Sequence, residues 1–410
     1  MKIISCTLLF LFLVLGSTVG NGQAFPEALL KKDKKAVVAF DYQHNFIVLD
    51  IRFHGILPLK FIYDTGAEHT LLFKREYTDI IGLPYQKRIP IIGADQSLEL
   101  DALICRDVLI GVGDLPAVEN DILVLEEDLF NLEQLTGTPI DGLLGTNFFR
   151  NFVVEIDFRR KQLTIWDPSE YTPARKFQEL EVHFKNNKPY IHCPTRIFPD
   201  STLNMELLFD TGAGLPLLLH NNTHPSLALP EKTITGRIGM GIGGMMKGYI
   251  GKINSVKIGA HEFHQLITSF QDLEDPLVQH ETKTRNGLIG NQILSKFNLV
   301  IDFPRNKLYL KPNRFFRKKI KYDKSGLTLF AVGSNLDQYL VQDVVKGSPA
   351  DEAGILPGDK IVGFGWWPAS WYSLDRITRK LQRREGKKIK MKVLRRGEEL
   401  KKSFYLKDLL

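Results

Sequence analysis

Two aspartates, Asp64 and Asp210, occur in the same short motif at two distant places in the chain. Each follows an apolar run and opens an Asp-Thr-Gly-Ala sequence, within residues 61–67 and 208–213. A carboxylate is costly to remove from water unless other groups hold it, so an aspartate at the end of an apolar run needs a partner. Two carboxyl groups brought close together cannot both ionise cheaply, and they share one proton. Such a pair can activate a water molecule for the hydrolysis of a peptide bond.

The residues that follow each aspartate suit this chemistry. Gly66 and Gly212 let the backbone approach closely and direct N–H groups toward the carboxylates. Thr65 and Thr211 offer hydroxyl groups that can tie the two turns together. We therefore expect these four residues to support a catalytic pair formed by the two aspartates.

An internal repeat accounts for the two copies of the motif. The two aspartates lie 146 positions apart, and an apolar-apolar-glycine motif recurs at 143–145 and 288–290, 145 positions apart. Short runs rich in Val, Ile, Leu and Phe, broken by Gly, Pro and Asp, dominate both copies, which predicts strands. One helix, or two short turns, is expected over residues 122–134. The predicted fold class is mainly β, with two homologous lobes, each a β-barrel or a sandwich, and a small α/β domain.

The two copies resemble the retropepsin-like aspartic proteases in a fused, bilobed form. The motif at 64–72 is similar to the active-site loop of that family, and 210–214 to a second copy of it. The family's later motif, two apolar residues and a glycine before a short helix, is similar to residues 143–149 and 288–294. The resemblance covers about residues 40–311 and implies a catalytic Asp64/Asp210 pair that needs no metal or organic cofactor.

The resemblance also implies two lobes, at 36–168 and 177–312, and glycine-tipped flaps that close over the substrate. The flaps fall near residues 91–95 and 238–248, and Gly-rich surface hairpins without such a role are the alternative. The predicted substrate-binding residues are Ile92, Gly93, Ala94, Gly241, Ile242 and Gly243.

Ala67 and Ala213 depart from the pepsin pattern, in which a serine or threonine usually follows the Asp-Thr-Gly sequence. A hydroxyl group at that position could stabilise the ionised carboxylate, so its absence should leave the pair less acidic. We expect a pH optimum that is mildly acidic or neutral.

Residues 320–410 resemble a PDZ domain of the kind attached to bacterial exported proteases. Gly-Ser-Pro-Ala, Ala-Gly-Ile and Pro-Gly-Asp occur in that order within 347–359, and a helix is expected over 373–382. Such domains add a peptide to a sheet edge as an extra strand and hold its terminal carboxylate on backbone N–H groups. The resemblance assigns that role to Gly326, Leu327 and Thr328, with a rigid spacer or a clamp on the lobes as the alternative.

Composition and the first residues indicate an exported globular protein. The apolar fraction of 43% and the charged fraction of 25% argue against a disordered chain and a polytopic membrane protein. Residues 1–24 have the layout of a signal peptide, with Lys2, an apolar run over 7–15 and small residues after it. We expect a periplasmic or secreted protein, with membrane association as an alternative and no transmembrane span beyond the signal peptide. Export argues against nucleic acid as a partner, although the formal net charge is +7.

These features predict an exported aspartic endopeptidase that acts on a polypeptide substrate. Its PDZ domain would bind substrate or a partner peptide, including a C-terminal peptide. The competing interpretation is a scaffold protein that has lost catalysis and acts through the PDZ domain. A disulfide between Cys105 and Cys193 is left open, because nothing in the sequence places the two close together.

Overall fold

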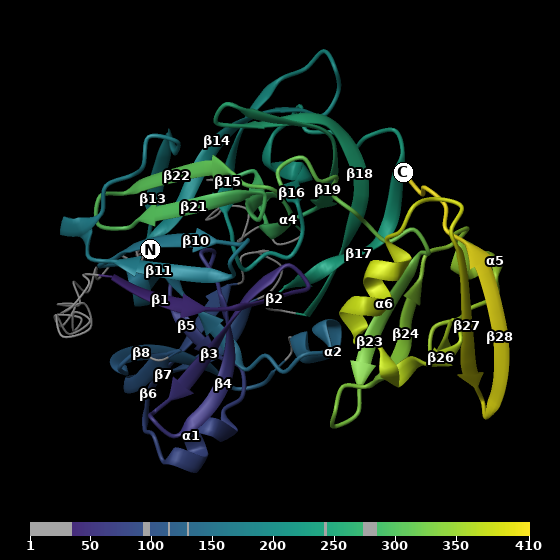
Figure 1. The fold of residues 1–410 in the computed structure, drawn as a ribbon, viewed down its shortest axis with the longest axis horizontal. Coiled ribbons are helices and arrows are strands. Elements are labelled where there is room, and N and C mark those ends of the chain that lie inside the picture. Colours follow the sequence, from purple (N-terminus) through teal and green to yellow (C-terminus); the bar gives the residue numbers. More distant parts are fainter. Residues whose placement is uncertain (1–34, 93–98, 114, 129–130, 242–243, 274–284) are drawn as a thin grey trace, which may run out of the picture.

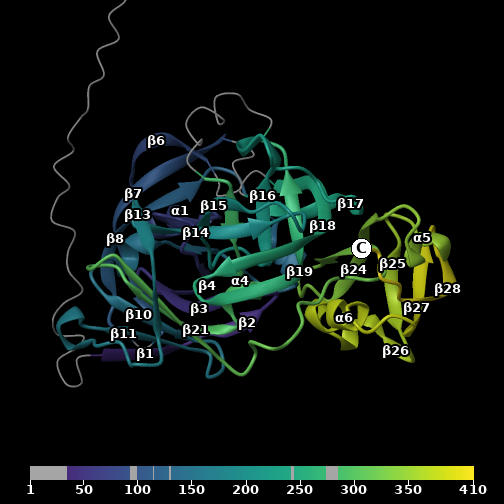
Figure 2. The ribbon, with the colours of Figure 1, turned by 90° about the horizontal axis from the view of Figure 1, so that it is seen from above.

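The computed structural model describes residues 35–92, 99–113, 115–128, 131–241, 244–273 and 285–410. These residues form two β-rich lobes and a smaller C-terminal domain beside them (Figures 1 and 2). The predicted signal peptide lies outside the described residues. Within them, no helix combines the length and the apolar character needed to span a membrane.

The first lobe is an eight-stranded sheet in the order β2-β3-β4-β9-β5-β8-β7-β6. Buried and exposed residues alternate along the second half of β3, as expected for a strand with one face on the core. β3 also pairs with β7, which closes the sheet into a barrel. The strands are β2 (Asp41–Gln43), β3 (Phe46–Phe53), β4 (Leu57–Tyr63), β5 (Thr70–Leu72), β6 (Tyr85–Ile92), β7 (Glu99–Val112), β8 (Val118–Leu125) and β9 (Gly142–Leu144).

The second lobe repeats this strand order as β13-β14-β15-β20-β16-β19-β18-β17, and β14 also pairs with β18. The internal repeat seen in the sequence is therefore a repeat of the fold. The strands are β13 (Val182–Lys185), β14 (Lys188–Arg196), β15 (Leu203–Phe209), β16 (Leu217–His220), β17 (Thr233–Gly241), β18 (Gly244–Ile258), β19 (His261–Gln271) and β20 (Gly287–Ile289).

A third sheet joins the two lobes, in the order β1-β11-β10-β21-β22-β12. Its centre is the antiparallel pair of β10 and β21, which come from corresponding hairpins of the two copies. One continuous apolar core runs through both lobes. The strands are β1 (Lys35–Ala39), β10 (Val153–Asp157), β11 (Gln162–Trp166), β12 (Gln178–Leu180), β21 (Phe297–Asp302) and β22 (Lys307–Pro312).

Helices in the lobes are short. The helix expected over 122–134 is largely wrong, because residues 122–125 belong to β8 and, of the residues described in this range, helical structure begins at α2 (Leu132–Thr136). The apolar run at 122–125 pairs with β5 and β7 instead, where its side chains enter the core. The other lobe helices are α1 (Glu76–Ile81), α4 (Asn291–Leu294), and the 3-10 helices η2 (Thr146–Phe149), η3 (Pro168–Glu170) and η4 (Asn221–Thr223).

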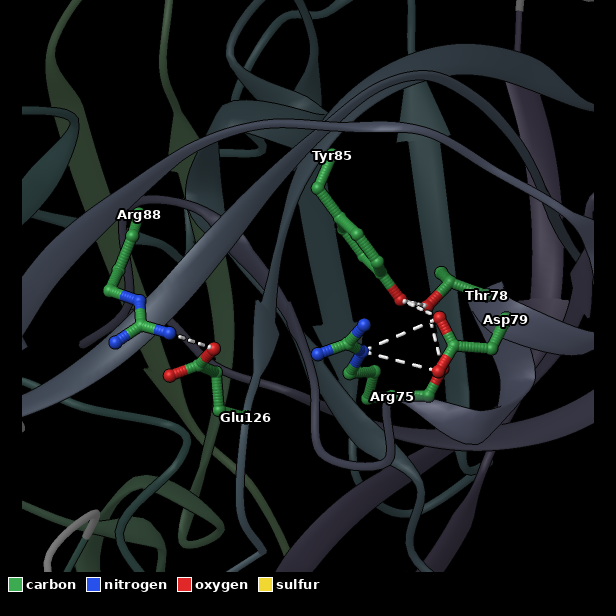
Figure 3. A network of polar contacts seen from close by, with 6 residues as sticks. All are labelled: Arg75, Thr78, Asp79, Tyr85, Arg88 and Glu126. Carbon is green, nitrogen blue, oxygen red and sulfur yellow. Dashed lines mark hydrogen bonds and ion pairs between the residues drawn. The ribbon is translucent and has the colours of Figure 1, made fainter.

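Polar contacts fix the base of β6, the strand that leads to the first predicted flap (Figure 3). The hydroxyl group of Tyr85 donates to Asp79 Oδ1 at 2.6 Å, and Asp79 also pairs with Arg75 at 3.1 Å. Further along β6, Arg88 pairs with Glu126 at 2.6 Å. These contacts hold β6 against α1 and the end of β8.

The C-terminal domain is a sheet in the order β23-β24-β25-β27-β28 with β26 paired to β25. The helix predicted over 373–382 is confirmed as α6 (Leu374–Leu381), whose N-cap Ser373 accepts a hydrogen bond from the Arg376 N–H at 3.3 Å. The remaining elements are β23 (Leu327–Val332), β24 (Gln338–Val344), α5 (Pro349–Glu352), β25 (Lys360–Phe364), β26 (Trp367–Pro368), η5 (Ala369–Trp371), β27 (Lys388–Arg395) and β28 (Glu398–Tyr405).

Both lobes contact the C-terminal domain. From the second lobe, Arg237 Nε lies 3.4 Å from Asp343 Oδ2, and the Lys252 ammonium donates to the Leu410 carbonyl oxygen at 3.0 Å. From the first lobe, α2 packs against β23 and lies near α6 (Figure 1). Cys105 and Cys193 are free thiols buried in different lobes, so the two do not form a disulfide in this structure.

Candidate active site

Asp64 and Asp210 follow equivalent strands and occupy equivalent positions. Asp64 comes directly after β4, and its N–H donates to the Leu144 carbonyl oxygen at 3.0 Å. Asp210 comes directly after β15, and its N–H donates to the Ile289 carbonyl oxygen, also at 3.0 Å. The repeated apolar-apolar-glycine motif thus supplies the neighbouring strand, β9 or β20, that positions each aspartate.

The two threonines that follow the aspartates bind each other's loop. The Thr65 N–H donates to Thr211 Oγ1 at 3.0 Å, and the Thr211 N–H donates to Thr65 Oγ1 at 2.9 Å. Each hydroxyl group donates onward across the lobe boundary, Thr65 to the Phe209 carbonyl oxygen at 2.6 Å and Thr211 to the Tyr63 carbonyl oxygen at 2.8 Å. Both side chains are fully buried, so this network fixes the relative position of the two loops.

Gly66 and Gly212 leave space for the opposite carboxyl group. A Cβ atom on Gly66 would lie 2.7 Å from Asp210 Cγ, and one on Gly212 would lie 2.2 Å from Asp64 Cγ. Real side chains do not tolerate such contacts, so any larger residue must displace the carboxyl group. The glycines therefore allow the two carboxyl groups to meet, as the sequence analysis expected.

The two carboxyl groups lie against each other in a buried site. The side chains hydrogen-bond to each other, and the residues are 7% and 2% exposed. Burial raises the pKa of both, and the neighbouring Asp64 charge raises the pKa of Asp210 further, well above its usual range. Asp64 Oδ1 accepts two N–H groups, from Gly66 at 2.7 Å and Ala67 at 3.1 Å, whereas Asp210 Oδ1 accepts only that of Gly212, at 2.7 Å. This difference favours the ionised form at Asp64 and the protonated form at Asp210.

Two cations near the pair were not predicted from the sequence. Lys188, the first residue of β14, lines the cavity into which the two aspartates open, and its charge lowers the pKa of Asp64. Burial lowers the pKa of Lys188 itself. Arg285 is 6% exposed, and its charge lowers the pKa of Asp210. Neither cation belongs to a repeated motif, so only the folded chain reveals their place beside the carboxyl groups.

The aspartates open into a cavity of about 610 Å³. Its walls include residues of both predicted flap hairpins, namely Ile91 on β6, Ile238, Gly239 and Gly241 on β17, and Met246 on β18. Of the predicted flap residues, Gly241 lines the cavity and Ile92 ends β6. Gly93, Ala94, Ile242 and Gly243 lie outside the described residues.

The C-terminal domain contributes a third wall to this cavity. Leu327, Thr328 and Leu329 reach it from β23, and Thr378 and Leu381 reach it from α6. Leu327 and Thr328 were predicted to bind a peptide, but their place in the same cavity as the aspartates was not. Gly326 is not among the residues that line it, and its N–H donates to Asp323 Oδ1 at 2.8 Å.

One group of side chains in the described residues has the composition of a metal site. His183, His192 and Glu206 lie on neighbouring strands of the second lobe, with ligand atoms within 4.8 Å of one another. None of the three lines the cavity, and Glu206 already pairs with the Lys185 ammonium at 3.1 Å. The group has no part in the chemistry of the aspartates.

Comparison with known sequence families agrees with this arrangement. Residues 49–148 match the aspartyl protease family, and this segment contains Asp64, β4 and β9. Residues 340–395 match the PDZ domain family, from β24 through β27. The chain therefore carries an aspartyl protease domain in its first lobe and a PDZ domain at its C-terminal end.

Proposed function

We propose that the protein is an exported aspartic endopeptidase whose Asp64/Asp210 pair hydrolyses peptide bonds. The observation that carries the proposal is the hydrogen-bonded contact between the two carboxyl groups at the base of the cavity. The match of the first lobe to aspartyl proteases supports the same reaction class. The mainly apolar cavity wall fits an extended polypeptide.

The proposed reaction uses one water molecule and no covalent intermediate. Ionised Asp64 takes a proton from the water as its oxygen attacks the carbonyl carbon of the scissile bond. Protonated Asp210 donates its hydrogen bond, and then its proton, to the carbonyl oxygen. Asp64 then transfers its proton to the amide nitrogen, and Asp210 takes a proton from a hydroxyl group of the tetrahedral intermediate. The C–N bond breaks, and a carboxylic acid and an amine are released. The pair regains its single shared proton at the end of the cycle.

Substitution of either aspartate by asparagine tests this mechanism. Asp64→Asn and Asp210→Asn should each lower the rate of cleavage of an unfolded protein by at least about 100-fold, since each removes one proton-transfer group. Because burial raises the pKa of both carboxyl groups, neither substitution should lower the melting temperature. Undiminished turnover in both variants would refute the pair.

A scaffold protein that acts only through its PDZ domain is the second candidate. It is favoured only by the presence of a peptide-binding module, which the match over 340–395 supports. A wild-type protein that binds peptides but cleaves none, with the Asn variants indistinguishable from it, would establish this alternative. The proposal of an endopeptidase would then fail.

Export is proposed from the sequence of residues 1–24 alone. Expression of the full chain in a bacterial host should yield a shortened protein outside the cytoplasm. Amino-terminal sequencing of that protein should begin between residues 21 and 25. Recovery of the intact chain from the cytoplasm would contradict export.

A further inference from the structure

The loop that should hold a ligand carboxylate is already occupied by a carboxylate of this chain. Asp323 Oδ1 accepts the N–H groups of Ser325 and Gly326, both at 2.8 Å, and the Ser325 hydroxyl group at 2.7 Å. The next N–H, that of Leu327, donates to Ser325 Oγ at 3.2 Å. Three consecutive backbone donors, ending at the first residue of β23, are thus engaged locally.

The charge of Asp323 also opposes a second carboxylate. Burial raises the pKa of Asp323 to about 6, and the hydrogen bonds from Ser325 and Gly326 oppose that increase. At neutral pH the side chain is therefore ionised. A ligand carboxylate placed at this loop would meet a negative charge and engaged donors, and like charges at close range repel.

The side-chain groove next to this loop remains open, and it opens toward the aspartates. β23 is the edge strand of its sheet, so one side of its backbone has no strand partner among the residues that the structure describes. Leu327 and Leu329 on β23 and Thr378 and Leu381 on α6 line the cavity that also contains Asp64. An extended peptide added to this edge would present its side chains to a mainly apolar surface that is bordered by Asp323.

The far end of the same groove is filled by the first lobe. A Cβ atom on Gly137, at the end of α2, would lie 2.9 Å from Leu374 Cβ and 3.4 Å from Ala331 Cβ. Leu374 begins α6 and Ala331 lies near the end of β23, so Gly137 stands between the two walls. A bound peptide has no free path along the whole of β23. Its continuation lies in the cavity, beside Leu135 and Thr136 of α2.

We propose that the open part of the groove, formed by Leu327, Leu329, Thr378 and Leu381, is a substrate subsite of the protease. It binds an internal, apolar, extended segment of the polypeptide that is being cut, and a free C-terminus is not required. This inference rests on the proposed endopeptidase function and names its substrate class. The segment and the scissile bond lie on one continuous chain, because the groove and the aspartates share one cavity.

The first test compares two forms of one substrate. A fluorogenic peptide that the full-length protein cleaves is synthesised with a free C-terminal carboxylate and with a C-terminal amide, each carrying the apolar segment. The two forms should have kcat/KM values within about twofold of each other. A tenfold or greater preference for the free acid, about 1.4 kcal/mol, would overturn the proposal.

The second test places a charge in the groove without altering the domain core. Thr378→Glu changes a half-buried position on α6, and a charge there opposes the binding of an apolar segment. The KM of the full-length protein for the long peptide should rise about tenfold or more. Leu356→Glu adds the same charge at a 47% exposed position outside the cavity and serves as the control. Equal KM values in the two variants would overturn the proposal.

A third measurement separates this inference from the proposed reaction. Fluorescence anisotropy reports binding of the acid and amide peptides to the full-length Asp64→Asn variant, which the proposed function makes inactive. Equal binding of both forms, weakened by Thr378→Glu, supports the subsite whether or not wild type cleaves them. Binding of the free acid alone contradicts the subsite but does not contradict the proposed reaction.

Discussion

Thr65 and Thr211 each accept the backbone N–H of the other through the side-chain hydroxyl group, at 2.9 and 3.0 Å respectively. The contact is symmetrical because the two residues occupy the same position in the two copies of the repeat. It joins loops that belong to different lobes and that each carry one aspartate. The separation of the two carboxyl groups therefore depends on two buried hydroxyl groups.

The symmetry predicts that two substitutions of Thr211 differ strongly in their effect on the free energy of unfolding. Thr211→Val keeps the shape but leaves the Thr65 N–H and the Tyr63 carbonyl oxygen without their partner, which should lower the free energy of unfolding by about 2–4 kcal/mol. Thr211→Ser keeps the hydroxyl group and should cost about 1 kcal/mol. Urea denaturation measures both. Equal losses in the two variants would show that the hydroxyl group is unimportant.

The close approach at Gly212 predicts a loss of activity from one added methyl group. A Cβ atom there would lie 2.2 Å from Asp64 Cγ, so Gly212→Ala must move the carboxyl group. Displacement of a catalytic group by about 1 Å can reduce the rate about 100-fold, and we expect kcat to fall by at least that factor. Gly236→Ala is the matched control, because nothing lies within 4 Å of its added Cβ. Wild-type kcat in Gly212→Ala would contradict the proposed geometry.

The aspartate pair could be predicted from the sequence because its motif occurs twice in the chain. Each copy carries the same apolar run, tripeptide and later glycine motif, and the repeat gives each carboxyl group its partner. Lys188 and Arg285 could not be predicted, because each occurs once and reaches the pair only through the packing of the second lobe.

The position of the PDZ domain relative to the two lobes could not be predicted from the sequence either. Motifs within 347–359 identify the domain, but they say nothing of which surface faces the lobes. That surface is set by contacts such as Arg237 with Asp343, between residues about 100 positions apart that belong to no motif. The hydrogen bonds from Ser325 and Gly326 to Asp323 likewise depend on the three-dimensional turn of the loop.

The pH dependence of activity should reflect the burial of the pair and its neighbouring cations. The proposed mechanism requires ionised Asp64 and protonated Asp210, so activity should rise through the pKa of the first and fall through that of the second. Burial raises the pKa of both, which predicts an optimum at mildly acidic or neutral pH. A pH-rate profile with its maximum below about pH 3 would contradict this expectation.

Lys188 should set the acidic limb of that profile. Its charge lowers the pKa of Asp64, so Lys188→Met should move the acidic limb of kcat/KM to higher pH. Lys185→Met removes a lysine three residues earlier that pairs with Glu206 and does not line the cavity, and it should leave the profile unchanged. An unchanged acidic limb in Lys188→Met would show that this charge does not act on Asp64.

Asp323 predicts a pH dependence of stability that is separate from catalysis. Its pKa is about 6 in the folded protein and about 3.9 in an unfolded chain, so the folded state binds more protons between these values. The contribution of Asp323 to stability is therefore fully present below about pH 4 and is lost as the pH rises through 6. At about 1.4 kcal/mol per pKa unit, this loss amounts to at most about 3 kcal/mol.

Asp323→Asn keeps an oxygen that can accept the loop N–H groups but does not titrate. The difference in free energy of unfolding between wild type and Asp323→Asn, measured by urea denaturation at pH 4 and pH 7.5, should shift in favour of the variant at the higher pH. A difference that is the same at both pH values would contradict the raised pKa.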